Sequence, residues 1–213
     1  MKKPNIFVVG QSGSGKSTSL RNLDPARTII LNTEQKQLPF KGAGKFKRMA
    51  MIPSFESFQK YFADALTKAD ADVIVLESFT SLCEMIMMKA KKIHTGWDVR
   101  NYFNDKVFEL VLASKNTEKY VVFIGIDETV DSIDGIAFRQ VKIDGKQLKG
   151  IEKEFVITLF TVPREDNGKV VYEFVTGGDV IRSAKSPMEM LPEKMPNDLA
   201  EIIKLSEQYY TGE

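Results

Sequence analysis

Four short apolar runs recur through the first part of the chain, at residues 5–9, 28–31, 72–76 and 120–124. Each run is continuous rather than alternating, which is typical of strands covered on both faces in a parallel sheet. Apolar residues at helical spacing between the runs predict helices over 16–22, 55–66, 80–93 and 99–114. The pattern therefore predicts an alternating β-α fold whose mostly parallel sheet is flanked by helices.

The pattern changes after residue 127. Shorter strand-like runs follow at 155–162, 170–175 and 180–181, separated by Asp166-Asn167-Gly168 and Gly177-Gly178. Such turn residues between short strands predict antiparallel hairpins, and a last helix is expected over 197–208. With 43% hydrophobic residues in 213, we expect one domain, 1–213, that ends in this antiparallel hairpin extension.

A complete phosphate-binding loop follows the first strand. It consists of Gly10, Gln11, Ser12, Gly13, Ser14, Gly15, Lys16 and Ser17, with Thr18 directly after it. Glycines let successive backbone N–H groups point at phosphates, the lysine reaches the β and γ phosphates, and the next hydroxyl binds magnesium. We therefore expect ATP, or GTP, together with Mg²⁺, held through Lys16 and Ser17.

A carboxylate closes the third apolar run. Glu77 follows Val73-Ile74-Val75-Leu76, the position from which a Walker B acid reaches magnesium or its water shell. Aspartate is usual there, and the longer glutamate would have to recede or act through water. Asp72, which precedes the run, is interpreted as a turn residue.

The second run ends in Asn32-Thr33-Glu34, which is similar to the Asp-Thr-Glu pattern of RecA-like recombinases. The order of the phosphate loop, this triplet, residues 76–80, Trp97 and residues 183–187 resembles the short, single-domain RecA-like ATPases of bacteriophages, a group linked to single-strand annealing and recombination. The resemblance spans most of the chain, although only the phosphate loop is highly specific.

The resemblance implies roles for further residues. Glu34 would polarise the attacking water. The alternative interpretation is that Glu34 is only a solvated carboxylate at a strand end. Lys185 would reach the γ-phosphate held by a neighbouring subunit, or else is a solvated lysine. The expected partners are single-stranded DNA, further copies of the chain in a ring or filament, and a single-strand-binding protein. The expected location is the host cytoplasm. One departure follows the fourth apolar run. Relatives place Gln or His after the corresponding strand, whereas this sequence has Gly125-Ile126-Asp127-Glu128.

Two basic segments are candidates for DNA contact, because the net charge of +1 requires any basic footprint to be local. The first spans 36–48 and holds Lys36, Lys41, Lys45, Lys47 and Arg48 without an acidic residue. The second spans 129–150 and contains Arg139, Lys142, Lys146 and Lys149. Charge runs are also common in ordinary solvated loops, so that alternative stays open.

Other function classes remain possible. A small-molecule kinase would share the phosphate loop but generally needs an arginine-rich lid, whereas Arg164 and Arg182 are the only arginines after Arg139. A non-catalytic, nucleotide-dependent assembly factor would bind ATP without turnover. The single residues Cys83 and His94 predict neither a disulfide nor a zinc site, and no apolar run reaches the ~18 residues that span a bilayer.

Overall fold

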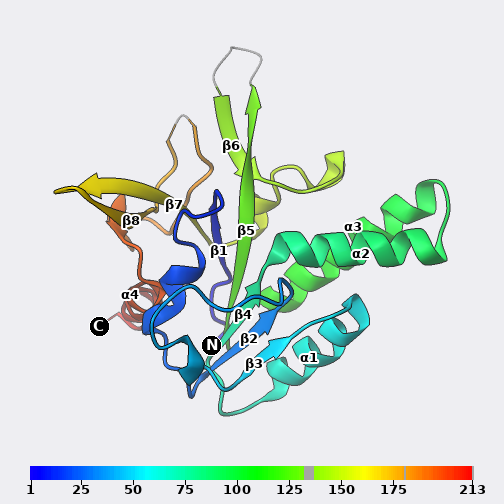
Figure 1. Cartoon of the computed structure of the whole chain (residues 1–213), viewed down its shortest axis with the longest axis horizontal. Helices are drawn as coiled ribbons and strands as arrows, with labels where there is room; N and C mark the ends of the chain where they lie inside the picture. The colour runs from blue at the N-terminus through cyan, green and yellow to red at the C-terminus, as the bar shows by residue number, and fades with distance from the viewer. Residues whose placement is uncertain (132–136, 180, 213) are drawn as a thin grey trace.

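The computed structural model describes residues 1–131, 137–179 and 181–212, and its centre is a nine-stranded sheet (Figure 1). The strand order is β3-β2-β4-β5-β1-β7-β8-β9, and β6 pairs with the far end of β5. The strands are β1 (Ile6–Gly10), β2 (Thr28–Asn32), β3 (Met49–Met51), β4 (Val73–Glu77), β5 (Tyr120–Asp131), β6 (Ala137–Val141), β7 (Ile157–Asp166), β8 (Lys169–Val175) and β9 (Lys194–Pro196).

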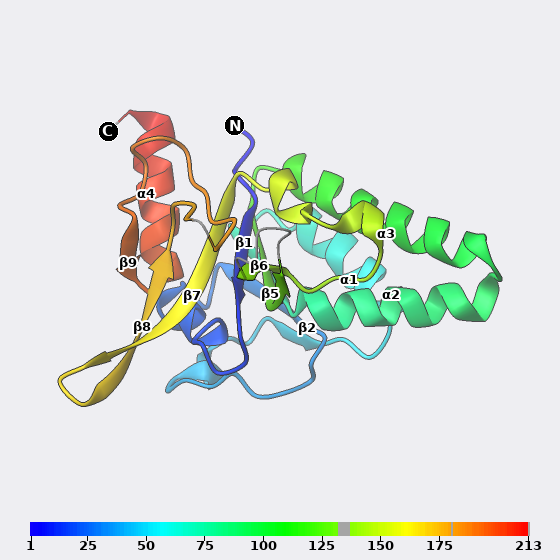
Figure 2. The same ribbon diagram turned by 90° about the horizontal axis from the view of Figure 1, so that it is seen from above.

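Helices cover both faces of this sheet, as Figure 2 shows. The α-helices are α1 (Phe55–Thr67), α2 (Phe79–Ile93), α3 (Trp97–Lys115) and α4 (Leu199–Thr211). The 3-10 helices are η1 (Ser17–Asn22), η2 (Ala43–Lys45), η3 (Lys146–Leu148) and η4 (Ile151–Glu154). The predicted α/β class, with its mostly parallel sheet and flanking helices, is confirmed.

The strands from β3 to β7 in the sheet order run parallel, so their carboxyl ends meet at one edge. In the register, Val9 of β1 lies opposite Gly125 of β5 on one side and Phe160 of β7 on the other. Parallel order places the phosphate loop, which leaves β1, beside the ends of β4 and β5. This edge is where ligands collect in open α/β sheets.

Each face of the sheet packs a separate hydrophobic core. Under α1, α2 and α3, a cluster of aromatic rings has centroids 4.5 to 6.0 Å apart, formed by Phe7, Phe79, Phe123 and Phe155. The predicted stripe on α1 joins this core, with Phe55, Phe58 and Phe62 all buried. On the other face, Leu20 of η1 and Ile202 of α4 pack on β-branched residues of the sheet.

Several elements differ from the sequence-based expectation. The helix after the phosphate loop is a 3-10 helix, and the short strand β3 was not predicted. Strand β5 continues seven residues past the expected end at 124, because its far half pairs with β6. The second basic segment, 129–150, is thus partly a hairpin, and its residues 132–136 lie outside the described residues.

The antiparallel extension is confirmed in β7 and β8, which join through the expected turn at Asn167-Gly168. The strand expected at 180–181 is not confirmed. Residue 180 lies outside the described residues, and Ile181 belongs to a turn. β9 pairs with β8 instead, with Met195 opposite Phe174. Both side chains are buried in the core under α4, which explains why this short segment docks there.

Candidate nucleotide site

The phosphate loop turns back over the end of β1 with little space for side chains. Gly13 and Gly15 have φ of +77° and +94°, a backbone conformation that favours glycine. A Cβ on Gly15 would lie 2.6 Å from the ring of Tyr172 on β8. Gly10 is equally crowded by Thr161 of β7, whose hydroxyl is 2.5 Å from the Ser14 hydroxyl. The glycines therefore allow neighbouring strands to support the loop.

Lys16 folds back onto its own loop. Its Nζ donates to the carbonyl oxygens of Gly10 at 2.9 Å and Gln11 at 2.6 Å. Burial lowers the pKa of Lys16 from its ordinary value, and three nearby carboxylates offset part of this shift: Glu77, Asp127 and Glu34. The predicted acids of β2 and β4 therefore do converge on the lysine.

Ser17 and Glu77 form the pair expected of a magnesium site. The Ser17 hydroxyl donates to Glu77 Oε1 at 2.8 Å. Glu77 is only 7% exposed, and this burial raises the pKa of its carboxyl to about 7. Its Oε2 atom is buried and has no hydrogen-bond partner. A divalent cation would satisfy that oxygen and remove the cost of burying a charge, so the residues present fit Mg²⁺.

Glu34 lies just past the end of β2, next to the same edge. Its side chain is 26% exposed and pairs with Lys36 at 3.2 Å. The preceding residues hold this strand end in place: Thr33 Oγ1 donates to the Ser78 carbonyl at 2.8 Å, and the Asn32 amide donates to the Lys36 carbonyl at 2.7 Å. Glu34 is thus a partly solvated carboxylate on a firmly anchored turn, as a water-orienting group requires.

The family comparison agrees with this geometry. A family model described as an AAA domain (AAA_24) matches residues 2–180, which includes the phosphate loop and both acids. The chain belongs to this AAA-domain family. The family places this chain among nucleotide-binding P-loop ATPases. No curated protein matches the sequence.

Among solved structures, this AAA domain is similar to a KaiC-like protein from the hyperthermophilic archaeon Pyrococcus horikoshii OT3. The two share 11% identity at a TM-score of 0.48, with 82% of this chain and 78% of the other covered. Identity at this level says nothing about a shared activity. Among the helices that the structure describes, none has the length and apolar character to cross a bilayer.

Asp127 was missed as a site residue of this AAA domain. Gly10 lies opposite Ile126 in the sheet, so Asp127 directly follows the residue beside the phosphate loop. Its buried Oδ2 accepts from Arg139 of β6 at 2.6 Å, while Oδ1 has no partner. An acid that closes an apolar strand was the same signal that identified Glu77, and it could have identified Asp127 as well.

Thr161 and Tyr172, which support the phosphate loop, were also missed. They lie about 150 residues beyond the loop in the chain, and no local pattern marks them. Only the parallel pairing of β1 with β7, and the return of β8, brings them to the loop.

Lys185 lies away from the phosphate loop of its own chain. Its backbone bridges Thr158, which is opposite Phe7 near the amino end of β1. Its Nζ donates to the Lys153 carbonyl at 2.9 Å, and burial lowers its pKa from the ordinary value. A role for Lys185 at the γ-phosphate would therefore act across subunits, and it stays a prediction.

The two basic segments are less uniform than their sequences indicate. In the first, Arg48 pairs with Asp70 and Lys36 with Glu34, whereas Lys41, Lys45 and Lys47 are exposed. In the second, Arg139 is occupied by Asp127, whereas Lys142, Lys146 and Lys149 are exposed. Lysines rather than arginines are thus the cations open to a ligand in both segments.

Proposed function

We propose that this AAA domain hydrolyses ATP with Mg²⁺ and does so on single-stranded DNA as a homo-oligomer. The observation that carries the ATPase is the pair Ser17–Glu77, with its unpartnered Glu77 Oε2, beside the half-buried Lys16. A hydroxyl, a carboxylate and a cation converge on the phosphate loop, the arrangement that phosphoryl transfer needs.

Each residue of the nucleotide site would have a defined task in this reaction. The loop amides would bind the phosphates, and Lys16 would exchange the carbonyls of Gly10 and Gln11 for phosphate oxygens. Ser17 and ionised Glu77 would hold Mg²⁺, which when bound neutralises charge on the β and γ phosphates. Glu34 would orient the attacking water from its anchored turn.

The DNA and oligomer parts of the proposal have their own support. The exposed lysines of both basic segments support contact with phosphates, and the position of Lys185, away from the phosphate loop of its own chain, supports a role across subunits. Annealing, recombination and replication of phage DNA are processes that such an ATPase would serve. A single-strand-binding protein is a further expected partner.

Nothing in the described structure favours a kinase. Arg164 pairs with Glu173 at 2.8 Å, and Arg182 pairs with Asp179 at 2.6 Å. Neither arginine is therefore available to close over a transferred phosphate. An assembly factor without turnover would share the same binding loop, so hydrolysis must be measured.

The test is steady-state ATP turnover with magnesium, with and without poly(dT), and with a panel of nucleosides and nucleoside monophosphates. We expect phosphate release that magnesium chelation stops and poly(dT) increases. Transfer of the γ-phosphate to a small acceptor would overturn the proposal in favour of a kinase. Tight ATP binding with no phosphate release under any condition would overturn it in favour of an assembly factor.

A further inference from the structure

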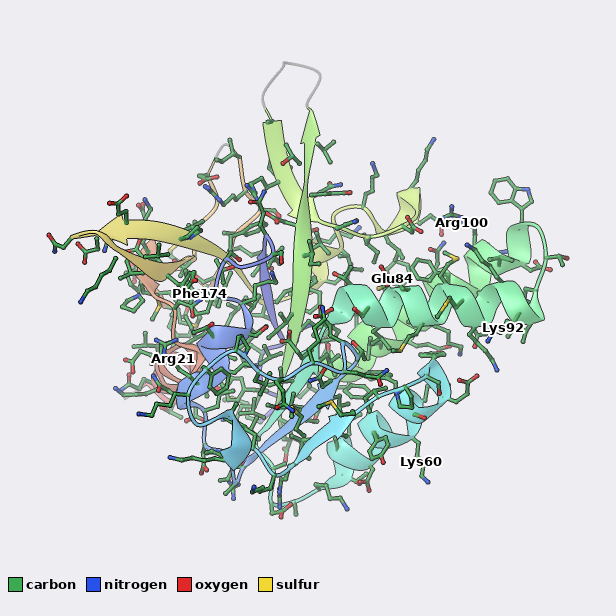
Figure 3. The ribbon with its side chains drawn as sticks, viewed as in Figure 1. Arg21, Lys60, Glu84, Lys92, Arg100 and Phe174 are labelled. Atoms are coloured by element: carbon green, nitrogen blue, oxygen red, sulfur yellow. The ribbon has the colours of Figure 1, made fainter. Side chains whose placement is uncertain are left out.

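A groove of about 470 Å³ lies between the start of α3 and the segment that holds η3. One wall comes from α3, with Trp97, Arg100 and Asn104, and the other comes from the loop, with Lys146, Gln147 and Lys149. Figure 3 shows Arg100 next to the η3 segment. The α2–α3 hairpin extends away from the phosphate loop (Figure 1), and the groove lies along the part of this hairpin where α3 begins.

Trp97 is the most exposed large apolar side chain of the described residues, at 84%. It begins α3 directly after Gly96, whose φ of +58° turns the chain between α2 and α3. Exposing an indole ring to water is unfavourable, and the ring belongs to neither core. A flat, rigid ring at the end of a groove is a surface on which a base can stack.

The groove is also strongly basic. Arg100, Lys146 and Lys149 are exposed, and within the part of the chain that the structure describes none of them forms an ion pair. The groove lining contains no carboxylate. By contrast, Arg27 is neutralised by Asp72 and Arg139 by Asp127. Three uncompensated cations at one groove favour a polyanion.

A buried amide adds a specific acceptor to the groove. The Asn104 amide donates to Gln147 Oε1 at 2.7 Å and so joins the two walls. Asn104 is 7% exposed, and its Oδ1 atom has no hydrogen-bond partner. A buried carbonyl oxygen without a partner is costly, and an N–H donor of a base, such as the imide N–H of thymine, would satisfy it.

We propose that this groove is a single-stranded DNA site, in which a base stacks on Trp97 and the backbone phosphates contact Arg100, Lys146 and Lys149. An aromatic platform beside a row of cations is the combination that binds single strands without strong sequence preference. The inference rests on the proposed function, because it names the surface on which that DNA lies. It also extends the second basic segment with two residues of α3.

The groove has a direct structural link to the nucleotide site. Its loop wall follows β6, and Arg139 of β6 holds Asp127, which lies within β5 directly after the residue beside the phosphate loop. Only five residues separate Arg139 from Gly145, which forms part of the groove.

Trp97 is the only tryptophan of the chain, so the unmodified protein reports on the groove. Titrating wild-type protein with oligo(dT) at low salt and an ATP analogue should quench tryptophan fluorescence in parallel with binding measured by anisotropy of a labelled strand. Binding by anisotropy without any change in tryptophan fluorescence would overturn the groove while leaving DNA binding intact. No binding by either readout would overturn the proposed DNA partner itself.

Substitutions provide the second test. Trp97→Ala should weaken oligo(dT) binding roughly 10-fold, the effect of losing one stacked base. Met188→Ala, a matched control at a side chain that is 82% exposed, should leave binding unchanged. Equal affinity of Trp97→Ala and wild type would overturn the proposal, provided that both keep the basal ATP turnover expected for a site away from the phosphate loop.

The cations are tested through salt dependence. Replacing Arg100, Lys146 and Lys149 with Gln should lower the log–log salt slope by about 2, since each phosphate contact on a single strand contributes ~0.7. The charge-matched control replaces the exposed residues Lys60, Lys169 and Lys194 with Gln; Lys60 lies on α1, away from the groove (Figure 3). Equal loss of slope in both triple variants would show a general charge effect and overturn the groove as the contact.

Discussion

The nucleotide site and the groove are built in opposite ways. At the nucleotide site, Glu77 is buried and Lys16 is half-buried, and each lies near the opposite charge of the other. At the groove, Arg100 and Trp97 stand exposed, and nothing in the described structure offsets the positive charge. The first arrangement suits a small ligand that binds together with a metal ion at the carboxyl edge of the sheet. The second suits a polymer that lies across the protein surface.

This difference has an energetic consequence. Buried, mutually dependent groups lose function when one of them is removed, because the others are left without a partner. Exposed cations act nearly independently and each contributes little. Substitutions in the nucleotide site should therefore have large effects on turnover, and those in the groove should have graded effects on affinity.

The largest effect is expected for Lys16→Ala. The β and γ phosphates would lose the loop's cation, so ATP hydrolysis should be abolished and ATP binding greatly weakened. Phosphate release and calorimetric ATP titration would measure both. Binding of oligo(dT) without nucleotide should persist, since Trp97 and Arg100 are untouched. Near-normal turnover in this variant would refute the assignment of the phosphate loop.

Glu34→Gln should come next, with turnover lowered about 10²-fold or more and ATP binding retained, because an amide cannot polarise water as a carboxylate does. Glu77→Gln should first raise the magnesium concentration needed for half-maximal turnover. Rates measured across a magnesium series separate the two. Loss of chemistry at saturating magnesium in Glu77→Gln alone, with Glu34→Gln silent, would show that the base is on β4.

A pH effect of intermediate size follows from the burial of Glu77. Its folded pKa of about 7 lies above the ordinary 4.5, so the folded state binds this proton more tightly. The stabilisation is present below 4.5 and is lost as pH rises to 7, which amounts to on the order of 3 kcal/mol. With EDTA present, Glu77→Gln should gain thermal stability relative to wild type between pH 5 and pH 8. A constant difference in Tm would contradict this.

The smallest enzymatic signal is expected from mixing variants. If Lys185 acts across a subunit boundary, Lys185→Ala and Glu34→Gln, each inactive alone, should recover part of the ATPase activity when combined. Mixed oligomers contain some interfaces in which both groups are intact. If labelled subunits exchange but activity does not recover, Lys185 does not act across subunits. Its role would then be limited to the hydrogen bond with the Lys153 carbonyl.

The same contrast explains what could be predicted from the sequence. The phosphate loop is contiguous, and Glu34 and Glu77 follow apolar runs, so parallel strand order alone brings them together. The groove joins residues 97–104 to 145–149, which no local periodicity connects. Strand β3 was missed because it has only three residues. The far half of β5 was missed because its partner β6 lies in the second basic segment, where no strand was predicted.

Arg139 illustrates why the sequence alone does not predict which charged residues are available to a ligand. From the sequence it was one of several cations in a glycine-containing segment, open to DNA. In the fold its guanidinium lies 2.5 Å from Asp127 Oδ2, because the hairpin register places the two residues on one face. Sequence shows where charges are, but only tertiary pairing shows which of them are already neutralised.

The most direct test of an ATPase that acts on DNA is the affinity of wild-type protein for oligo(dT) with a non-hydrolysable ATP analogue and with ADP, at low salt and with magnesium. We expect tighter binding with the analogue, because a γ-phosphate at the phosphate loop would lie near Asp127, whose partner Arg139 belongs to the strand that precedes the groove loop. Equal affinity in both nucleotide states, or no binding in either, would contradict the link between ATP and single-stranded DNA.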